Sequence, residues 1–339
     1  MGGFFMHISK YFLLGGLFFV SANANAVSIY DNSISAANIN MLTVELIKNA
    51  HHGESLSDFI KRKNLYGTMT RFDEYGDDGS TLDTISKSDY SDSLVQDIWI
   101  DGGYINTKAN YASALNKERS RFYLATAGFD SLDFDLPTGT IMFGGFFGYI
   151  NGNAAGFDSK GYTIGLFTRY NYQNLSISAM LDNGALKNDS GVYNFNNDWW
   201  NVAVEASWKI RLEKTLYLEP ELYFGYNYVK ADDQVRIYGD TVSVKNFNFW
   251  NISPSIKLVK QISNKWYIGG FAKYINTSGG NGDIVFQGTK YNGIKIKDYT
   301  ETGINLEYDC DPFVFELNAK KQFGKFDGWL GNINIKYLF

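Results

Sequence analysis

The sequence predicts an all-β protein: a single closed antiparallel transmembrane β-barrel of about 12 strands, preceded by a short helical segment. Three observations predict it. Segments of ten or more residues alternate between apolar and polar side chains, aromatic residues make up 17% of the chain, and only four prolines occur in 339 residues. Alternation with a period of two is typical of strands whose two faces meet different surroundings.

The start of the chain has the features of an export signal. Lys10 precedes the apolar run 11–20, and residues 24–26 follow the A-x-A pattern of a cleavage site. A run of about ten apolar residues is too short for a membrane-spanning helix, which needs about 20. We therefore expect residues 1–26 to be a signal peptide for Sec-type export that is cleaved after Ala26.

Residues 27–95 follow a different pattern. Ile39, Leu42 and Leu46 recur at helical spacing, and the stretch from Ser55 to Asp58 is typical of a capping box that opens a second short helix. An acidic stretch follows, which indicates a solvated linker. We expect a short helical segment and acidic linker, acting either as a plug for the barrel lumen or as a vestigial passenger.

From Gln96 to Phe339 the chain divides into alternating segments. In residues 200–210 one face is apolar, from Trp200 to Ile210, and the other is polar. An even number of strands brings both ends of a bacterial barrel to the periplasmic side. We expect strands over residues 96–107, 119–130, 138–151, 158–172, 173–183, 197–210, 215–230, 246–260, 265–276, 297–309, 312–323 and 328–339.

The expected connections differ in length. Tight turns, such as residues 211–214, are expected at one end, and long polar loops over 184–196, 231–245 and 277–296 at the other. Short periplasmic turns and long extracellular loops are typical of outer-membrane barrels. Pro220 and Pro254 fall inside expected strands of a barrel that has no free edge, so we expect a bulge or a rim position at each.

A soluble β-sandwich or lipocalin-like barrel also alternates, with its apolar face filling the core. The membrane interpretation is favoured because aromatic side chains lie near the expected strand ends, where the interfacial girdles of a membrane barrel belong. The members of this set are Trp199, Trp200, Trp208, Tyr226, Tyr228, Trp250 and Trp266.

Charge and composition argue against several partners. The net charge is −5 and the pI is near 5.3, so no basic surface for nucleic acid is expected. A single cysteine, Cys310, cannot form an internal disulfide. His51 and His52 lie near Glu54 but lack the four ligands of a structural zinc site. We expect no metal and no cofactor.

The expected barrel contains no histidine to act as a catalytic base, so we expect no enzyme. Glu219 and Glu221 share a strand face about 7 Å apart, a spacing that also suits acid–base chemistry. We favour a place for both in a mixed-charge lumen. The side chains that the alternation turns toward the lumen are Arg169, Glu205, Lys209, Glu219, Glu221, Lys273, Glu301, Glu307, Glu316, Lys320 and Lys336.

Taken together, residues 96–339 resemble the translocator β-domain of autotransporters. The residues that carry the resemblance are Ile98-Trp99-Ile100 with Gly102-Gly103, the stretches 144–149 and 161–165, and the alternating C-terminal residues Ile333, Ile335, Tyr337 and Phe339. The resemblance implies a twelve-stranded barrel in the outer membrane of a Gram-negative cell. It also implies that the C-terminal residues are the signal read by the barrel-assembly machinery.

In that family the barrel anchors a passenger that is exported to the cell surface. Passengers there usually reach several hundred residues, whereas here only about 70 separate the expected cleavage site from the barrel. We expect a barrel that anchors, and exports through its lumen, its own short N-terminal segment. A narrow porin-like channel gated or plugged by the N-terminal helices, or a surface-exposed structural or adhesive antigen, are the alternatives. Outer-membrane lipid and lipopolysaccharide are the expected surroundings, and a monomer is the expected state.

Overall fold

The computed structural model describes the barrel part of the chain. The described residues are 95–109, 118–131, 133–154, 157–189, 194–231, 235–237, 240–244, 246–279, 284–286, 289–291, 298–324 and 326–339. The expected signal peptide, helical segment and acidic linker lie outside them. Within these ranges no helix is long and apolar enough to cross a membrane.

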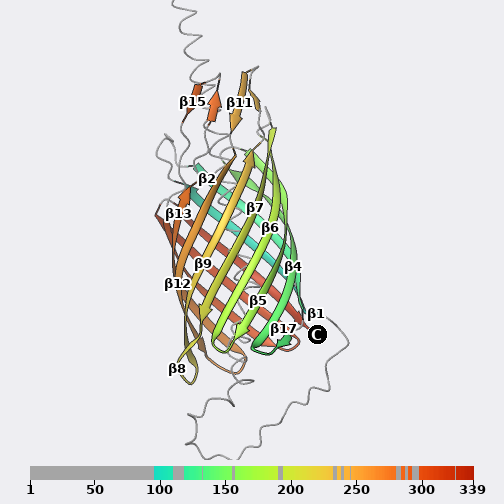
Figure 1. Ribbon diagram of the computed structural model, residues 1–339, viewed down its shortest axis with the longest axis vertical. Coiled ribbons are helices and arrows are strands. Elements are labelled where there is room, and N and C mark those ends of the chain that lie inside the picture. Colours follow the sequence, from blue (N-terminus) through green and yellow to red (C-terminus); the bar gives the residue numbers. More distant parts are fainter. Residues whose placement is uncertain are drawn as a thin grey trace, which may run out of the picture.

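Twelve long antiparallel strands close into one barrel, which confirms the expected fold class (Figure 1). Each strand pairs with the next, and the last pairs with the first, so that Ile98 lies opposite Tyr337. The barrel strands are β1 (Val95–Ala109), β2 (Glu118–Ser131), β4 (Gly139–Ala154), β5 (Phe157–Tyr172), β6 (Leu175–Asp189), β7 (Asn194–Trp208), β9 (Leu216–Ala231), β12 (Phe247–Gln261), β13 (Trp266–Gly279), β16 (Tyr299–Cys310), β17 (Phe313–Gly324) and β18 (Phe326–Leu338).

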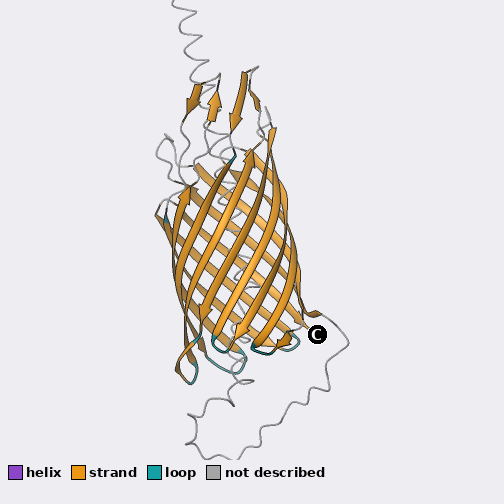
Figure 2. Cartoon of the chain, in the orientation of Figure 1, coloured by secondary structure: helices purple, strands orange, loops and turns teal. Residues whose placement is uncertain are grey.

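The remaining strands are short. β3 (Phe134–Leu136) pairs with β4, and β8 (Ile210–Glu213) pairs with β9. A separate four-stranded sheet extends beyond the end of the barrel that lies opposite the C-terminus (Figures 1 and 2). Its strands are β10 (Val235–Ile237), β11 (Asp240–Val244), β14 (Ile284–Phe286) and β15 (Thr289–Tyr291). The sequence analysis expected only loops in these two stretches.

The expected long loop over residues 184–196 is wrong, because β6 continues to Asp189 and β7 begins at Asn194. The stretch stays in the sheet but is polar on both faces, because Lys187, Asp189, Asn194 and Asn196 are exposed on the outside and Asn188 faces the lumen. Asn188 is fully buried, accepts a hydrogen bond from Ser159 Oγ at 2.7 Å and donates one to Asn197 Oδ1 at 2.8 Å. Such side-chain pairs satisfy polar groups that burial separates from water.

Both prolines inside strands coincide with interruptions of a hydrogen-bonded ladder. Pro220 of β9 lies opposite the break between β7 and β8, and Pro254 of β12 falls where the pairing with β13 is interrupted between Ile252 and Ser255. A proline has no N–H to donate to a ladder. The register of β12 on β13 continues unchanged across the gap. A bulge or a rim position was expected for Pro254. It lies instead in mid-strand, at a local gap in the ladder.

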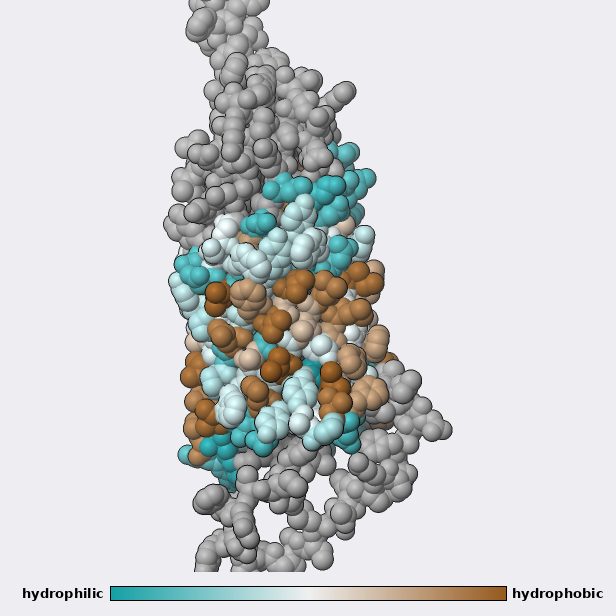
Figure 3. Space-filling view, in the orientation of Figure 1, coloured by the Kyte–Doolittle hydropathy of each residue, from teal (hydrophilic) through white to brown (hydrophobic). Residues whose placement is uncertain are grey.

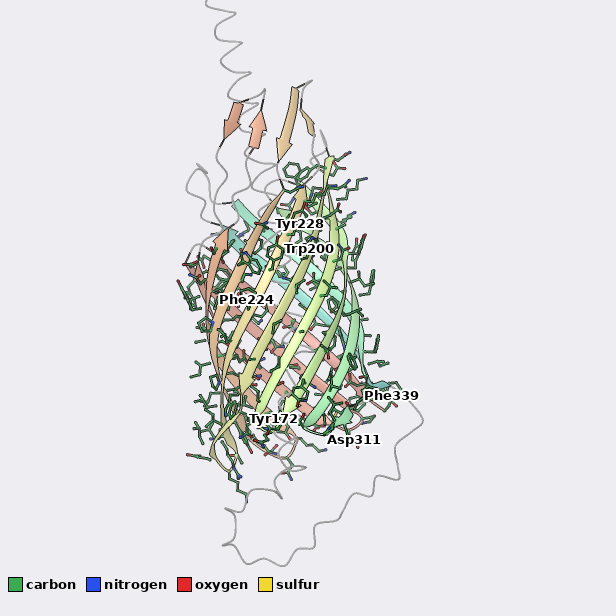
Figure 4. All side chains as sticks on the ribbon, viewed as in Figure 1. Tyr172, Trp200, Phe224, Tyr228, Asp311 and Phe339 are labelled. Atoms are coloured by element: carbon green, nitrogen blue, oxygen red, sulfur yellow. The ribbon has the colours of Figure 1, made fainter. Side chains whose placement is uncertain are left out.

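The outer surface carries an apolar band between two polar ends (Figure 3). Aromatic side chains gather near the strand ends; Trp200 packs against Tyr226 with ring centroids 5.1 Å apart, and Tyr172 lies near the opposite end (Figure 4). Trp199 does not belong to this girdle, contrary to expectation, because it is 1% exposed and faces inward. Strict alternation along β7 puts it on the opposite face from Trp200.

Candidate functional site: the barrel lumen

The inward-facing side chains of the strands form the lumen, the candidate functional site. Eight of the eleven charged residues expected there are buried, namely Lys209, Glu219, Lys273, Glu301, Glu307, Glu316, Lys320 and Lys336. The other three, Arg169, Glu205 and Glu221, are half-buried. Several alternate with exposed apolar neighbours, as Lys209 does with Trp208 and Ile210, which is the pattern of a strand between lipid and lumen.

One side of the lumen carries a cluster of apolar side chains, which lies among inward-facing polar groups that include Arg169, Asp182 and Glu205. We call it the apolar wall; it consists of the buried side chains Trp99, Met142, Phe146, Phe167, Met180, Ala203 and Tyr223, most of them on β4 to β7. Glycines on neighbouring strands make room for the rings. A Cβ placed on Gly165 would lie 2.3 Å from Phe146 Cζ, and one on Gly144 would lie 2.1 Å from Phe167 Cζ. The rings therefore lie against the barrel wall, where only glycine fits.

The opposite side of the lumen is charged. We call it the charged wall; it consists of the inward-facing side chains Lys257, Lys273, Glu301, Glu307, Glu316, Lys320 and Lys336 on β12 to β18. Going round the barrel, β16 lies six strands from β5, on the far side of a twelve-stranded ring. The centres of the two walls thus lie on opposite sides of the lumen, and their edges meet where Trp99 is the register partner of Lys336.

Glu219 and Glu221 have different partners on β12. Lys257 Nζ lies 3.6 Å from Glu219 Oε2, and Ser255 Oγ donates a hydrogen bond of 2.7 Å to Glu221 Oε2. The two carboxylates are therefore held separately along the strand. This pairing stabilises charges in the wall and gives no shared carboxylate pair for acid–base chemistry.

Lys336 joins three strands near the C-terminal end of the barrel. Its Nζ on β18 lies 3.3 Å from Asp97 Oδ2 on β1 and 3.4 Å from Asp130 Oδ2 on β2. Trp99 Nε1 donates a hydrogen bond of 3.2 Å to the other oxygen of Asp130. All three charged side chains are almost fully buried. This cluster crosses the seam where the first and last strands meet.

Other charges of the charged wall are held by amides and aromatic rings. Gln322 Nε2 donates a hydrogen bond of 2.9 Å to Glu301, and Asn305 Nδ2 donates one of 3.5 Å to Glu316. Lys273 Nζ lies 4.9 Å from the centre of the Tyr223 ring. A cation over an aromatic face is attracted by the ring quadrupole.

Six charged inward-facing residues of the described ranges were not among those expected. They are Asp97, Asp101, Asp130, Asp182, Asp309 and Lys257, and the first four are at most 3% exposed. The signal that finds them is the alternation already used, because Asp97 and Asp101 flank the exposed Ile98 and Ile100.

The C-terminal residues of the expected assembly signal lie on the outer face of β18. Ile333, Ile335, Tyr337 and Phe339 are all exposed, and Phe339 lies at the same end of the barrel as Asp311 (Figure 4). The rings of Tyr337 and Phe339 meet edge to face at 5.1 Å. Within the described residues no three His, Cys, Asp or Glu side chains are grouped so as to hold a metal ion.

The fold and its lumen define a transmembrane barrel of the translocator type. The family model of the autotransporter β-domain matches residues 98–288, more than half of the chain, and the chain belongs to this family. It is therefore an autotransporter-type barrel of the outer membrane, associated with type V secretion. Barrels of this family are generally non-enzymatic. A comparison with curated protein sequences gives no match.

Solved structures of autotransporter barrels are similar to this chain in fold. The translocator domain of NalP from Neisseria meningitidis has a TM-score of 0.62 at 13% identity, covering 92% of this chain and 99% of that one. The transport unit of AIDA-I from Escherichia coli has 0.59 at 16%, covering 76% and 93%. The β-domain of BrkA from Bordetella has 0.57 at 12%, covering 73% and 100%.

Proposed function

We propose that this barrel anchors its own N-terminal segment, residues 27–95, in the outer membrane and exports it through the lumen. The observation that carries the proposal is the pair of opposed walls, one apolar and one charged. Residues 1–26 then act as the signal peptide, removed after Ala26, and residues 96–339 as the barrel. The proposed function includes no catalytic step and no cofactor.

A two-walled lumen suits a polypeptide better than a uniform one. A chain in transit carries backbone and charged groups that cost free energy when they lose water without gaining partners. The charged wall provides both signs of charge and amides to replace that water. The apolar wall offers contacts to the apolar side chains of a chain in transit.

The structures with a similar fold are consistent with the same function. The NalP structure is described as a translocator domain and the AIDA-I structure as a transport unit. We extend this role to the present chain because its barrel closes with the same fold. The outward-facing Ile333, Ile335, Tyr337 and Phe339 are proposed to be the residues that the barrel-assembly machinery reads, and the closed ring of strands favours a monomer.

Surface exposure of the N-terminal segment tests this proposal. An epitope tag is inserted after Val27, and intact cells are treated with a protease that cannot cross the outer membrane. We expect the tag to disappear while the barrel stays in the membrane. A matched chain with the same tag in the turn between Gln261 and Lys265, at the end that carries the C-terminus, serves as the control for membrane integrity. If the tag after Val27 survives until the cells are lysed, the proposed export of the segment is wrong.

A narrow channel is the second candidate, and the charged wall favours it. Cations and carboxylates are both present there, from Lys257 to Lys336, and such a surface suits water and small ions. Single-channel conductance of the purified full chain in a planar bilayer separates the two functions. Stable, ion-selective conductance favours the channel, whereas a closed barrel favours the anchored segment. A surface antigen is the third candidate, favoured by the sheet of β10, β11, β14 and β15 beyond the barrel.

A further inference from the structure

Three cations gather on the outer face of β1 and β2, at the end away from the C-terminus. We call Lys108, Arg119 and Arg121 the outer basic cluster. Arg119 and Arg121 are exposed and Lys108 is half-exposed. Their neighbours Ser120 and Phe122 are buried. Because strand residues alternate between faces, the three cations point outward, away from the lumen.

The cluster brings like charges together. Lys108 lies directly opposite Arg119 in the register of β1 and β2, with Arg121 two residues further along β2. Opposed residues have Cβ atoms about 5 Å apart, and like charges at that distance destabilise the pair. Asp327 of β18 lies opposite Lys108 on the other side, but it is paired with Lys321.

Among the described residues, the cluster forms no ion pair or side-chain hydrogen bond. Another opposed pair of cations at this end, Lys160 and Lys187, has different surroundings. There Asp158 and Asp189 occupy the next outward-facing positions of the same two strands, so the local charges balance. The outer basic cluster has no such balance in the described part of the chain.

The cluster also has a defined depth relative to the membrane. Tyr123 lies two residues from Arg121, about 7 Å along the strand, and its ring centroid is 5.1 Å from that of Tyr104 on β1. Tyrosines mark the interface between the apolar core and the headgroups. Further along β1, Ile100 is 66% exposed within the apolar band. The cations therefore lie just outside the tyrosines, at the level of lipid headgroups.

We propose that the outer basic cluster binds the phosphate groups of the glycolipid of the outer leaflet, the lipid A portion of lipopolysaccharide. Arginine presents a planar set of donors that matches phosphate, and each such contact is a charge-assisted hydrogen bond. A phosphate between Lys108 and Arg119 removes their repulsion. The apolar surface of β1 below the tyrosine pair accepts the acyl chains, which a soluble phosphate does not have.

The test uses the purified full chain in detergent and does not depend on whether the N-terminal segment is exported. The thermal unfolding midpoint is measured during titration with bisphosphorylated lipid A, with the same glycolipid lacking both phosphates, and with inorganic phosphate. A ligand that binds only the folded barrel raises the midpoint according to its affinity. We expect stabilisation by bisphosphorylated lipid A and binding at least about tenfold weaker for the dephosphorylated form.

The variant K108Q/R119Q/R121Q locates the site. We expect its affinity for bisphosphorylated lipid A to fall at least about tenfold, because each cation near an anionic membrane surface contributes to the attraction. The control K214Q/K260Q/K265Q removes the same charge from exposed lysines at the other end of the barrel, and it should bind like the unaltered chain.

Three results would overturn the proposal: equal binding of the two glycolipids by the unaltered chain, the same shift with inorganic phosphate alone, or unchanged binding by K108Q/R119Q/R121Q. If that variant does not fold, the comparison of the two glycolipids still tests whether the phosphates are recognised, because it uses the unaltered chain. Surface exposure of a tag after Val27 is measured separately. A failure of lipid binding therefore does not contradict the proposed export function.

Discussion

At the scale of single residues, the interior depends on glycines that face aromatic rings. Gly165 and Gly144 lie under Phe146 and Phe167 on paired strands. An aromatic ring that covers a glycine of the adjacent strand fills the gap left by the missing side chain and helps to fix the register. A sequence shows that glycines recur in these strands, but only the strand register shows which ring covers which glycine.

Substitution Gly165→Ala tests this packing. The added Cβ would meet Phe146 Cζ at 2.3 Å and the backbone oxygen of Leu181 at 2.9 Å, so the ring and the neighbouring strand must move. We expect a loss of about 1–3 kcal/mol in folded stability, measured from the thermal midpoint of heat-modifiable migration. Gly102→Ala is the matched control, because nothing lies within 4 Å of a Cβ there. Equal midpoints for the two variants would contradict the packing argument.

At the scale of elements, the alternation of side chains predicts the strands well. All twelve barrel strands match expected segments, because a wall between lipid and lumen forces a period of two throughout. The expected fifth strand ended at residue 183, whereas β6 reaches Asp189. The end of β6 resembles a loop in the sequence because polar residues lie on both of its faces, with Lys187 and Asp189 exposed on the outside and Asn188 buried inside. The small sheet of β10, β11, β14 and β15 was missed because it joins two segments about 40 residues apart, and local patterns do not show such pairing.

The charged groups of the lumen were predictable, but their partners were not. Alternation placed Glu219 and Glu221 on one strand face, yet only the register of β9 on β12 shows that Lys257 and Ser255 hold them. Lys336 of the cluster at the closing seam was expected to face the lumen, but its partners Asp97 and Asp130 were not. The members of this cluster lie in the first, second and last strands, and only closure of the barrel brings Lys336 to Asp97.

Lys336→Met tests the contribution of this cluster to closure. The variant leaves Asp97 and Asp130 buried without their cation, and breaking a buried pair in this way costs about 3–5 kcal/mol. We expect a large fall in the thermal midpoint of the folded barrel. Lys214→Met, at an exposed lysine, is the matched control. Adding Asp97→Asn to Lys336→Met should restore part of the loss; if Lys336→Met alone is neutral, the cluster does not stabilise the seam.

At the scale of the whole molecule, the barrel combines an apolar band toward lipid with two unlike walls toward the lumen. The outer surface follows from composition and alternation, and was predictable. The separation of the lumen into two walls was not, because it depends on which strands lie opposite each other in the closed ring. β5 and β16 are more than 120 residues apart in sequence but face each other across the lumen.

Removal of residues 27–94, with the signal peptide retained, tests the proposed occupancy of the lumen. If this segment occupies the space between the walls, its loss opens a path lined by the charged wall. We expect the conductance of the truncated chain in a planar bilayer to exceed that of the full chain. Heat-modifiable migration verifies that the truncated barrel folds. Equal conductance for both folded chains would mean that the segment does not fill the lumen.

The two walls also set a rotational preference about the barrel axis. A helix inside the barrel presents residues three or four positions apart to the same side. If those on one side are apolar, turning the helix by half a revolution sets them against Lys273 and Glu301 and sets its polar side against Phe146 and Phe167. Rotating the helix by half a revolution therefore loses favourable contacts with both walls. An occupant of this lumen has one preferred azimuth, so its individual side chains have fixed neighbours.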